Sequence, residues 1–148
     1  MSERLIKFRE VVRPPLWLMA FIYFLALSLV VAIWAAMTTT VAAITFITLT
    51  IATIVIYFRS ALRIEVDENE LKVGKAHISL KHLGAVQVLT DKQMLAKRTR
   101  DADPAAYLAI RFWTPRGIVI DIADTRDTTP YWLVTSKKGE KLARAIKG

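Results

Sequence analysis

The longest feature of the hydrophobic pattern is an uninterrupted apolar stretch from Leu16 to Phe58. It contains no charged residue and no His, Asn, Gln, Gly or Pro. A helix of about 20 apolar residues crosses a bilayer, so this stretch is long enough for two crossings. Three threonines, residues 38–40, stand near its middle, and we expect the chain to reverse there. The pattern predicts a transmembrane hairpin with spans from Leu16 to about Met37 and from about Val41 to Phe58.

Small residues recur every four positions in the first span, at Ser28, Ala32 and Ala36. Such a row allows close contact between helices in a membrane. Two interpretations remain open: the row packs against the second span, or it supports a homo-oligomer formed through the hairpin.

After the hairpin the pattern changes to strict alternation, which is typical of half-buried strands. Leu62, Ile64 and Val66 alternate with charged residues, and further strands are predicted at 71–80, 83–89, 108–112, 118–122 and 131–134. The apolar phase switches at Gly74-Lys75, where we expect a β-bulge. Residues 90–104 are polar and are expected to form a loop.

A final amphipathic helix is predicted at the C-terminus. Ser136 can cap it, and Leu142, Ala143 and Ile146 would form its apolar face. About six antiparallel strands followed by one helix indicate an α+β domain, either a small antiparallel β-barrel or a bent sheet, closed by the helix. We therefore divide the chain into a cytoplasmic basic tail (1–15), the two-helix hairpin (16–58) and a cytoplasmic domain (59–148), and expect residues 61–148 to fold without the hairpin.

The charges beside the hairpin predict its orientation. Basic residues flank it on both sides, and the connecting turn carries no charge; these residues are Arg4, Lys7, Arg9, Arg13, Arg59 and Arg63. By the positive-inside rule both termini lie in the cytoplasm, in a multi-pass protein of the plasma (inner) membrane. A cleaved signal peptide is the alternative for the first span, but its apolar core is too long and no clear cleavage site follows.

The net charge of +8 indicates an anionic partner. Anionic membrane lipid is a suitable partner, because the basic segments lie next to the predicted transmembrane spans. Nucleic acid is the alternative, but the sequence contains no known nucleic-acid-binding motif. The chain has no cysteine, which excludes disulfides and thiol chemistry. We find no cofactor motif, no catalytic pair and no metal-ligand spacing, since neither His77 with His82 nor the aspartates 121, 124 and 127 complete a site.

An aromatic and basic cluster is the strongest candidate for binding: Arg111, Trp113, Arg116, Tyr131 and Trp132. Tyr107, Arg111 and Trp113 share one parity, opposite to Leu108, Ile110 and Phe112. If the second set faces the core, the first faces outward and could engage a lipid interface, a phosphate or a protein. The alternative is that Trp113 or Trp132 packs under the final helix.

A second candidate surface would contact anionic headgroups, because few residues separate the hairpin from the first strand. Its expected members are Arg59, Arg63, Lys97, Arg98 and Arg100. Each basic residue held near an anionic surface contributes roughly 1 kcal/mol.

Four stretches carry a resemblance to a known family: Arg63–Val66, Val73–Ile78, Arg111–Trp113 and Pro130–Val134. They resemble an uncharacterised family of small actinobacterial membrane proteins, a domain of unknown function. The order of elements is also similar to pleckstrin-homology-like barrels that follow a two-span hairpin. The resemblance implies architecture and location but no activity. We expect a non-enzymatic, membrane-anchored interaction module for protein or anionic lipid; the alternatives are a membrane-face enzyme or an accessory subunit of a membrane enzyme or transport complex.

Overall fold

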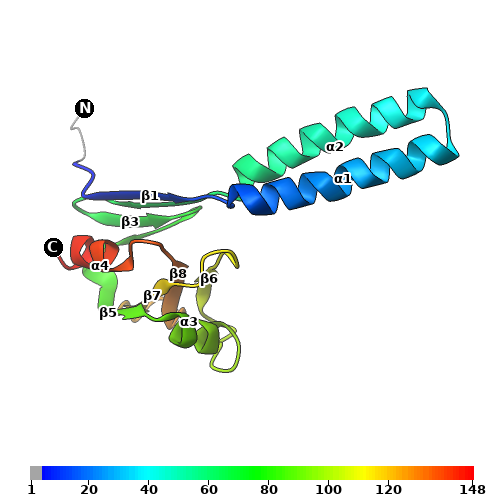
Figure 1. Ribbon diagram of the computed structural model, residues 1–148. Coiled ribbons are helices and arrows are strands. Elements are labelled where there is room, and N and C mark those ends of the chain that lie inside the picture. Colours follow the sequence, from blue (N-terminus) through cyan, green and yellow to red (C-terminus); the bar gives the residue numbers. More distant parts are fainter. Residues whose placement is uncertain (1–4) are drawn as a thin grey trace. The chain divides into compact units, whose positions relative to one another are not determined.

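The computed structural model describes residues 5–148 and divides into two units. One unit is the helical hairpin, residues 13–61. The other is an α+β unit formed by Leu62–Gly148 together with the segment that ends at Val12. Figure 1 shows the two antiparallel helices of the first unit and the two sheets of the second.

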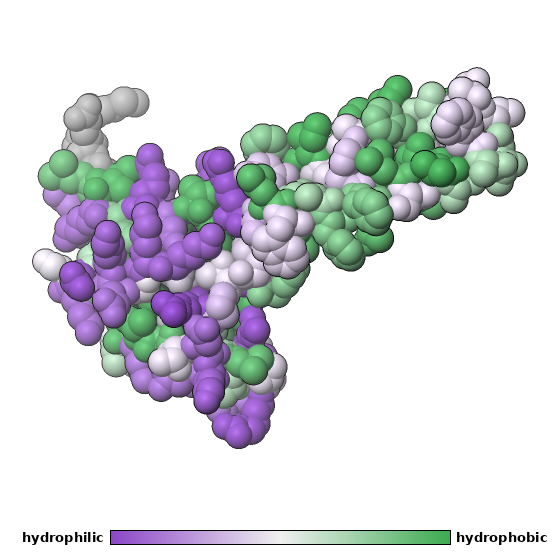
Figure 2. Space-filling view, in the orientation of Figure 1, coloured by the Kyte–Doolittle hydropathy of each residue, from purple (hydrophilic) through white to green (hydrophobic). Residues whose placement is uncertain are grey.

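The hairpin consists of α1 (Leu16–Ala36) and α2 (Thr39–Arg59), where the hydrophobic pattern predicted its two helices. With 21 residues each, both helices are long and apolar enough to cross a membrane. The reversal occurs at Met37 and Thr38, and the Thr38 hydroxyl caps α2 by accepting a hydrogen bond from the Val41 amide. Figure 2 shows apolar side chains along these helices and mostly hydrophilic ones over the α+β unit.

The row of small residues in α1 does not take part in the contact between the two helices. Tyr23 and Thr50 form an inter-helix hydrogen bond of 3.2 Å between their hydroxyls, and Ala42 is buried. Ser28, Ala32 and Ala36 are instead exposed. The prediction that this row packs against the second helix is therefore wrong, because the row faces outward; its use in a homo-oligomer stays a prediction.

The α+β unit is built on two four-stranded sheets. The first has the order β1-β2-β3-β4, and the second has the order β5-β7-β8-β6. Their strands are β1 (Phe8–Val12), β2 (Leu62–Val66), β3 (Glu70–Val73), β4 (Ala76–Ser79), β5 (Leu83–Leu89), β6 (Tyr107–Ala109), β7 (Gly117–Ile122) and β8 (Tyr131–Thr135). A 3-10 turn, Leu80–His82, joins the sheets, and the helices are α3 (Asp91–Arg98) and α4 (Gly139–Lys147).

The main core lies between the two sheets. Ile64 and Val73 come from the first sheet, Ile118 and Val134 from the second, and Leu142 of α4 joins them. A smaller core on the other face of the second sheet contains Leu133 and Met94 of α3. Because β8 is covered on both faces, all five of its residues are buried.

The strand β1 was not predicted from the sequence, which suggested only a basic tail there. It pairs antiparallel with β2 from Phe8↔Val66 to Val12↔Leu62. Val12 is fully buried in the main core. The hairpin is therefore inserted between two neighbouring strands of one sheet.

Three further expectations are corrected. The sheets do not close into a barrel: β4 and β5 are consecutive in the chain but belong to different sheets. Gly74-Lys75 is not a bulge but the two-residue turn between β3 and β4, with Gly74 at φ +61°, a value that glycine adopts readily. The sheet is not wholly antiparallel either, because β6 pairs parallel with β8.

The polar segment 90–104 contains α3 rather than a loop alone. Thr90 accepts a hydrogen bond from the Gln93 amide, and the Gln93 side chain accepts one from the Thr90 amide. This reciprocal capping box starts the helix, and Met94 anchors it in the smaller core.

Candidate functional site

A concave surface of the α+β unit lies where β5, the start of β7 and the start of α4 meet. Three adjoining hollows of about 360, 220 and 700 Å³ occur there, and Arg116 lines all three. We call this region the Arg116 cleft; its other principal members are Trp113, Thr114, Lys137, Lys138 and Glu140.

The Arg116 cleft is basic. Five basic and two acidic side chains line it; they are Lys92, Arg116, Lys137, Lys138 and Lys141 against Asp91 and Glu140. Arg116 Nε lies 3.2 Å from Asp91 Oδ1, but these side chains are 73% and 57% exposed. An ion pair so exposed contributes little to stability, so Arg116 can exchange Asp91 for another anion.

The wall of the cleft is the turn before β7, and hydrogen bonds tie it to β8. The Arg111 amide donates to Thr135 Oγ1 at 3.0 Å, and the Thr114 amide donates to the Arg111 carbonyl at 3.1 Å. The Ser136 amide then donates to the Arg116 carbonyl at 3.1 Å. Residues 111–116 are thus held by backbone contacts beside the segment that leads into α4.

Two buried donors in this wall have no hydrogen-bond partner within residues 5–148. They are the Trp113 indole Nε1 and the Thr114 hydroxyl Oγ1. Thr114 is only 2% exposed, and Trp113 packs partly against the main core. Because buried polar groups are nearly always paired in folded proteins, two unpaired donors at one hollow mark it as unusual.

A buried carboxylate holds the other side of the cleft. Glu10 of β1 is 8% exposed and accepts hydrogen bonds from Ser136 Oγ at 2.5 Å and from the Lys137 amide at 2.9 Å. Ser136 Oγ in turn accepts from the Lys138 amide at 3.1 Å. A negative charge is favoured near a helix N-terminus, so Glu10 fixes the approach to α4. Ser136 was expected to cap this helix; the N-cap residue is Lys138 instead.

The structure separates the predicted aromatic and basic cluster. Trp132 is 5% exposed and packs against Tyr107 in the main core, with ring centres 4.9 Å apart and the ring planes tilted by 52°. Tyr131 is 7% exposed in the smaller core. Only Trp113 and Arg116 come together, at the cleft, and Arg111 lies half-buried before them.

The predicted parity of residues 107–113 fails at four of the six residues, whereas Ile110 packs against the smaller core as a core-facing residue should. Tyr107 and Trp113 pack against the main core, whereas Leu108 and Phe112 are 44% and 67% exposed. The strand β6 is only three residues long, so alternation no longer applies after Ala109. A turn rather than a longer strand places Trp113.

The five residues expected to contact lipid lie on different elements. Arg59 ends α2, and Arg63 is exposed on β2. Lys97 lies over the Tyr131 ring, 4.5 Å from its centre, while Arg98 ends α3 half-buried and Arg100 is exposed, 3.5 Å from Asp101. Lys97 therefore has a packing role as well as a charge.

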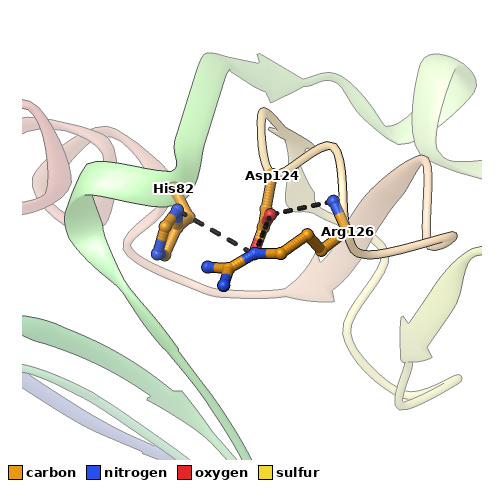
Figure 3. Close-up of polar contacts among 3 residues, drawn as sticks. All are labelled: His82, Asp124 and Arg126. Carbon is orange, nitrogen blue, oxygen red and sulfur yellow. Dashed lines mark hydrogen bonds and ion pairs between the residues drawn. The ribbon is translucent and has the colours of Figure 1, made fainter.

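The pKa of Asp124 is lowered from its ordinary value. The Arg126 amide donates to its carboxylate at 3.0 Å, which lowers the pKa of Asp124. The Arg126 guanidinium and His82, whose Nδ1 is 3.9 Å away, lower this pKa further (Figure 3). These contacts close the loop after β7, and the Asp127 amide adds a hydrogen bond of 3.2 Å to the Asp124 carbonyl.

Sequence reasoning missed Glu10, Thr114 and Lys137. Nothing in the local sequence distinguishes Thr114 and Lys137 as site residues. They line the cleft only because a turn packs against the start of α4. Glu10 shares a face with Phe8 and Val12, and an acidic residue on the apolar face of so short a strand hides the alternation. A T-x-x-Q sequence at Thr90 was a usable signal for α3.

Fold and site together define an α+β protein. Two long apolar helices are inserted between neighbouring strands of one sheet, and a basic cleft lies beside the last helix, α4. The chain belongs to the family described as Protein of unknown function (DUF3093), whose model matches residues 7–146. No curated protein and no solved structure is significantly similar to it.

Proposed function

We propose that this protein is a multi-pass protein of the plasma (inner) membrane that carries a non-enzymatic interaction domain on the cytoplasmic side. The observation that supports this most is the pairing of β1 with β2 across the hairpin. Strands that pair must lie on the same side of the membrane, so the hairpin crosses an even number of times. Basic residues at both ends of the hairpin favour the cytoplasm for that side.

The surface of the hairpin also supports membrane insertion. Large apolar side chains are exposed along its length; examples are Leu16 at 78%, Phe24 at 65% and Ile44 at 60%. An exposed apolar surface of this extent is not tolerated in water. Lipid is a suitable solvent for this surface, since the backbone groups in the interior of an α-helix are hydrogen-bonded within the helix.

The proposed partners of the domain are anionic lipid and a protein. Arg63, Arg98 and Arg100 have side chains that reach solvent, as an electrostatic contact with headgroups requires. Their attraction falls off over about 8 Å at physiological salt, so it acts only close to the surface.

The topology is tested by cysteine labelling in intact cells, which the absence of native cysteine makes direct. Gly148→Cys and Ser2→Cys should resist a membrane-impermeant maleimide, whereas Thr39→Cys should react. Labelling after permeabilisation is the control that each thiol is reactive. Reaction of Gly148→Cys in intact cells would overturn the proposal.

The lipid contact is tested by a flotation assay. The full chain is held in nanodiscs and mixed with anionic or neutral vesicles, and the amount of protein that floats with the vesicles is measured. Arg63→Glu, Arg98→Glu and Arg100→Glu together should abolish salt-sensitive recruitment of anionic vesicles. The same charge change at Lys72, Lys75 and Lys81 is the matched control. Equal loss from both triplets would indicate diffuse charge attraction and would contradict a defined lipid face.

A further inference from the structure

We propose that the Arg116 cleft binds a phosphate group. The group would sit in the hollow of about 220 Å³ lined by Trp113, Thr114, Arg116 and Lys137. This proposal goes beyond the membrane topology and does not depend on it, because the cleft belongs to the α+β unit alone.

The first observation is the pair of unpartnered donors. Along the chain from Leu5 onward, Trp113 Nε1 and Thr114 Oγ1 find no acceptor, although both atoms are buried. An indole N–H can only donate, so a group that satisfies it must be an acceptor. A phosphate offers several acceptor oxygens and can take hydrogen bonds from neighbouring donors at once.

The second observation is the charge around these donors. Arg116 and Lys137 line the hollow, and no acidic residue lines it. Lys138 and Lys141 line the neighbouring hollow together with Glu140, and Glu10 accepts a hydrogen bond from the Lys137 amide at the approach to α4. The excess of positive charge therefore comes from Arg116 and the lysine side chains. Arginine beside a hydroxyl donor is a common way of recognising phosphate.

The third observation is how the donors can be reached. Trp113 Nε1 and Thr114 Oγ1 are buried, whereas the side chain of Arg116, which lines the same hollow, is 73% exposed. An exposed arginine reorients at little cost, and Asp91 is a weak competitor. A phosphate group therefore enters the hollow by replacing Asp91 as the partner of Arg116.

The experiment follows indole N–H signals by NMR in the full chain, held in neutral nanodiscs and labelled with ¹⁵N-tryptophan. The chain has four tryptophans, and Trp113→Phe identifies the signal of interest. Inorganic phosphate should shift the Trp113 signal saturably, whereas chloride at equal ionic strength should not. The signals of Trp17 and Trp34 in α1 serve as internal controls. An unsaturable or absent shift overturns the proposal.

Variants separate a phosphate site from a structural role. Thr114→Val keeps the shape and should weaken phosphate binding about tenfold, as expected when a hydrogen bond to a charged group is lost; Thr114→Ser should restore it. If Thr114→Val does not fold, Arg116→Gln provides the same test at an exposed position. Lys147→Gln, at the far end of α4, is the matched charge control. Equal weakening by Arg116→Gln and Lys147→Gln overturns the proposal.

The source of the phosphate is assigned by two further titrations. Nanodiscs that contain phosphatidic acid should shift the Trp113 signal if a lipid headgroup is the ligand, and nanodiscs with phosphatidylglycerol control for negative charge. A shift with soluble phosphate but not with phosphatidic acid assigns the site to a soluble phosphorylated molecule.

Discussion

The carboxylate of Glu10 accepts a hydrogen bond of 2.5 Å from the hydroxyl of Ser136, which lies 126 residues further along the chain. Glu10 is on the strand that precedes the hairpin, and Ser136 follows the last strand. The strand before the hairpin and the segment between β8 and α4 are therefore joined at a buried polar contact. This contact also holds the entrance to α4 and one side of the Arg116 cleft.

We predict that Glu10→Ala destabilises the protein by about 1–3 kcal/mol, because the Ser136 hydroxyl and the Lys137 amide lose a buried acceptor. Chemical unfolding of the full chain in detergent, followed by tryptophan fluorescence, measures the change. Glu68→Ala, at an exposed turn position, should have a small effect. Equal stability of the two variants would show that the contact does not contribute.

We predict that the α+β unit folds without the hairpin and that it needs β1 for its full stability. Val12 pairs with Leu62, so residues 5–12 can be joined to residues 62–148 through a two-residue Asn-Gly turn. This joined protein should unfold cooperatively on heating, because it keeps Val12 in the core and Glu10 at Ser136. Residues 62–148 alone should melt at a lower temperature or without a cooperative transition. Identical melting curves would contradict a structural role for β1.

We predict that Gly117→Ala destabilises the protein by about 1–3 kcal/mol through overpacking. A Cβ atom at Gly117 would collide with the Val134 carbonyl oxygen and would lie 2.9 Å from Met94 Cε. Gly84→Ala is the comparison, since its Cβ would lie 3.3 Å from Asp121 Cβ, a tight contact that a small shift relieves. A larger loss of stability in Gly84→Ala than in Gly117→Ala would contradict the predicted overpacking between β7 and β8.

We predict that Asp124 stabilises the fold at neutral pH and not in strong acid. Its pKa is lowered in the folded protein, first by the Arg126 amide and then by nearby positive charge. The stabilisation is therefore complete above the unfolded pKa of about 3.9 and is lost as the pH falls through the lower folded value. Asp124→Asn should melt below the wild type at neutral pH, and the difference should shrink at acidic pH. A difference that is constant with pH would contradict the linkage.

The elements that the sequence predicted well depend on local pattern. The apolar stretch marked both helices because no charged side chain interrupts it, and alternation marked β2, β5 and β7. The exceptions depend on partners that are distant in the chain. Nothing local shows that β1 pairs with a strand on the other side of the hairpin, or that β6 lies parallel to β8.

The candidate site was harder to predict than the fold. Trp113 and Arg116 were singled out from their residue types, and they do line one hollow. Tyr131 and Trp132 were grouped with them by the same reasoning, but β8 is covered on both faces and buries them. Residue type alone could not distinguish a strand with two covered faces from one with an open face.

The insertion of the hairpin between β1 and β2 has a consequence for biogenesis. During synthesis β1 leaves the ribosome before the two helices, and its pairing partner emerges only after them. A chain in which one helix failed to insert would hold these two strands on opposite sides of the bilayer. Its sheet would lack an edge strand, and Ser136 would lack Glu10. With the proposed topology, completion of the domain would thus discriminate between correctly and incorrectly inserted chains, and an unfinished domain would expose its core to cellular proteases.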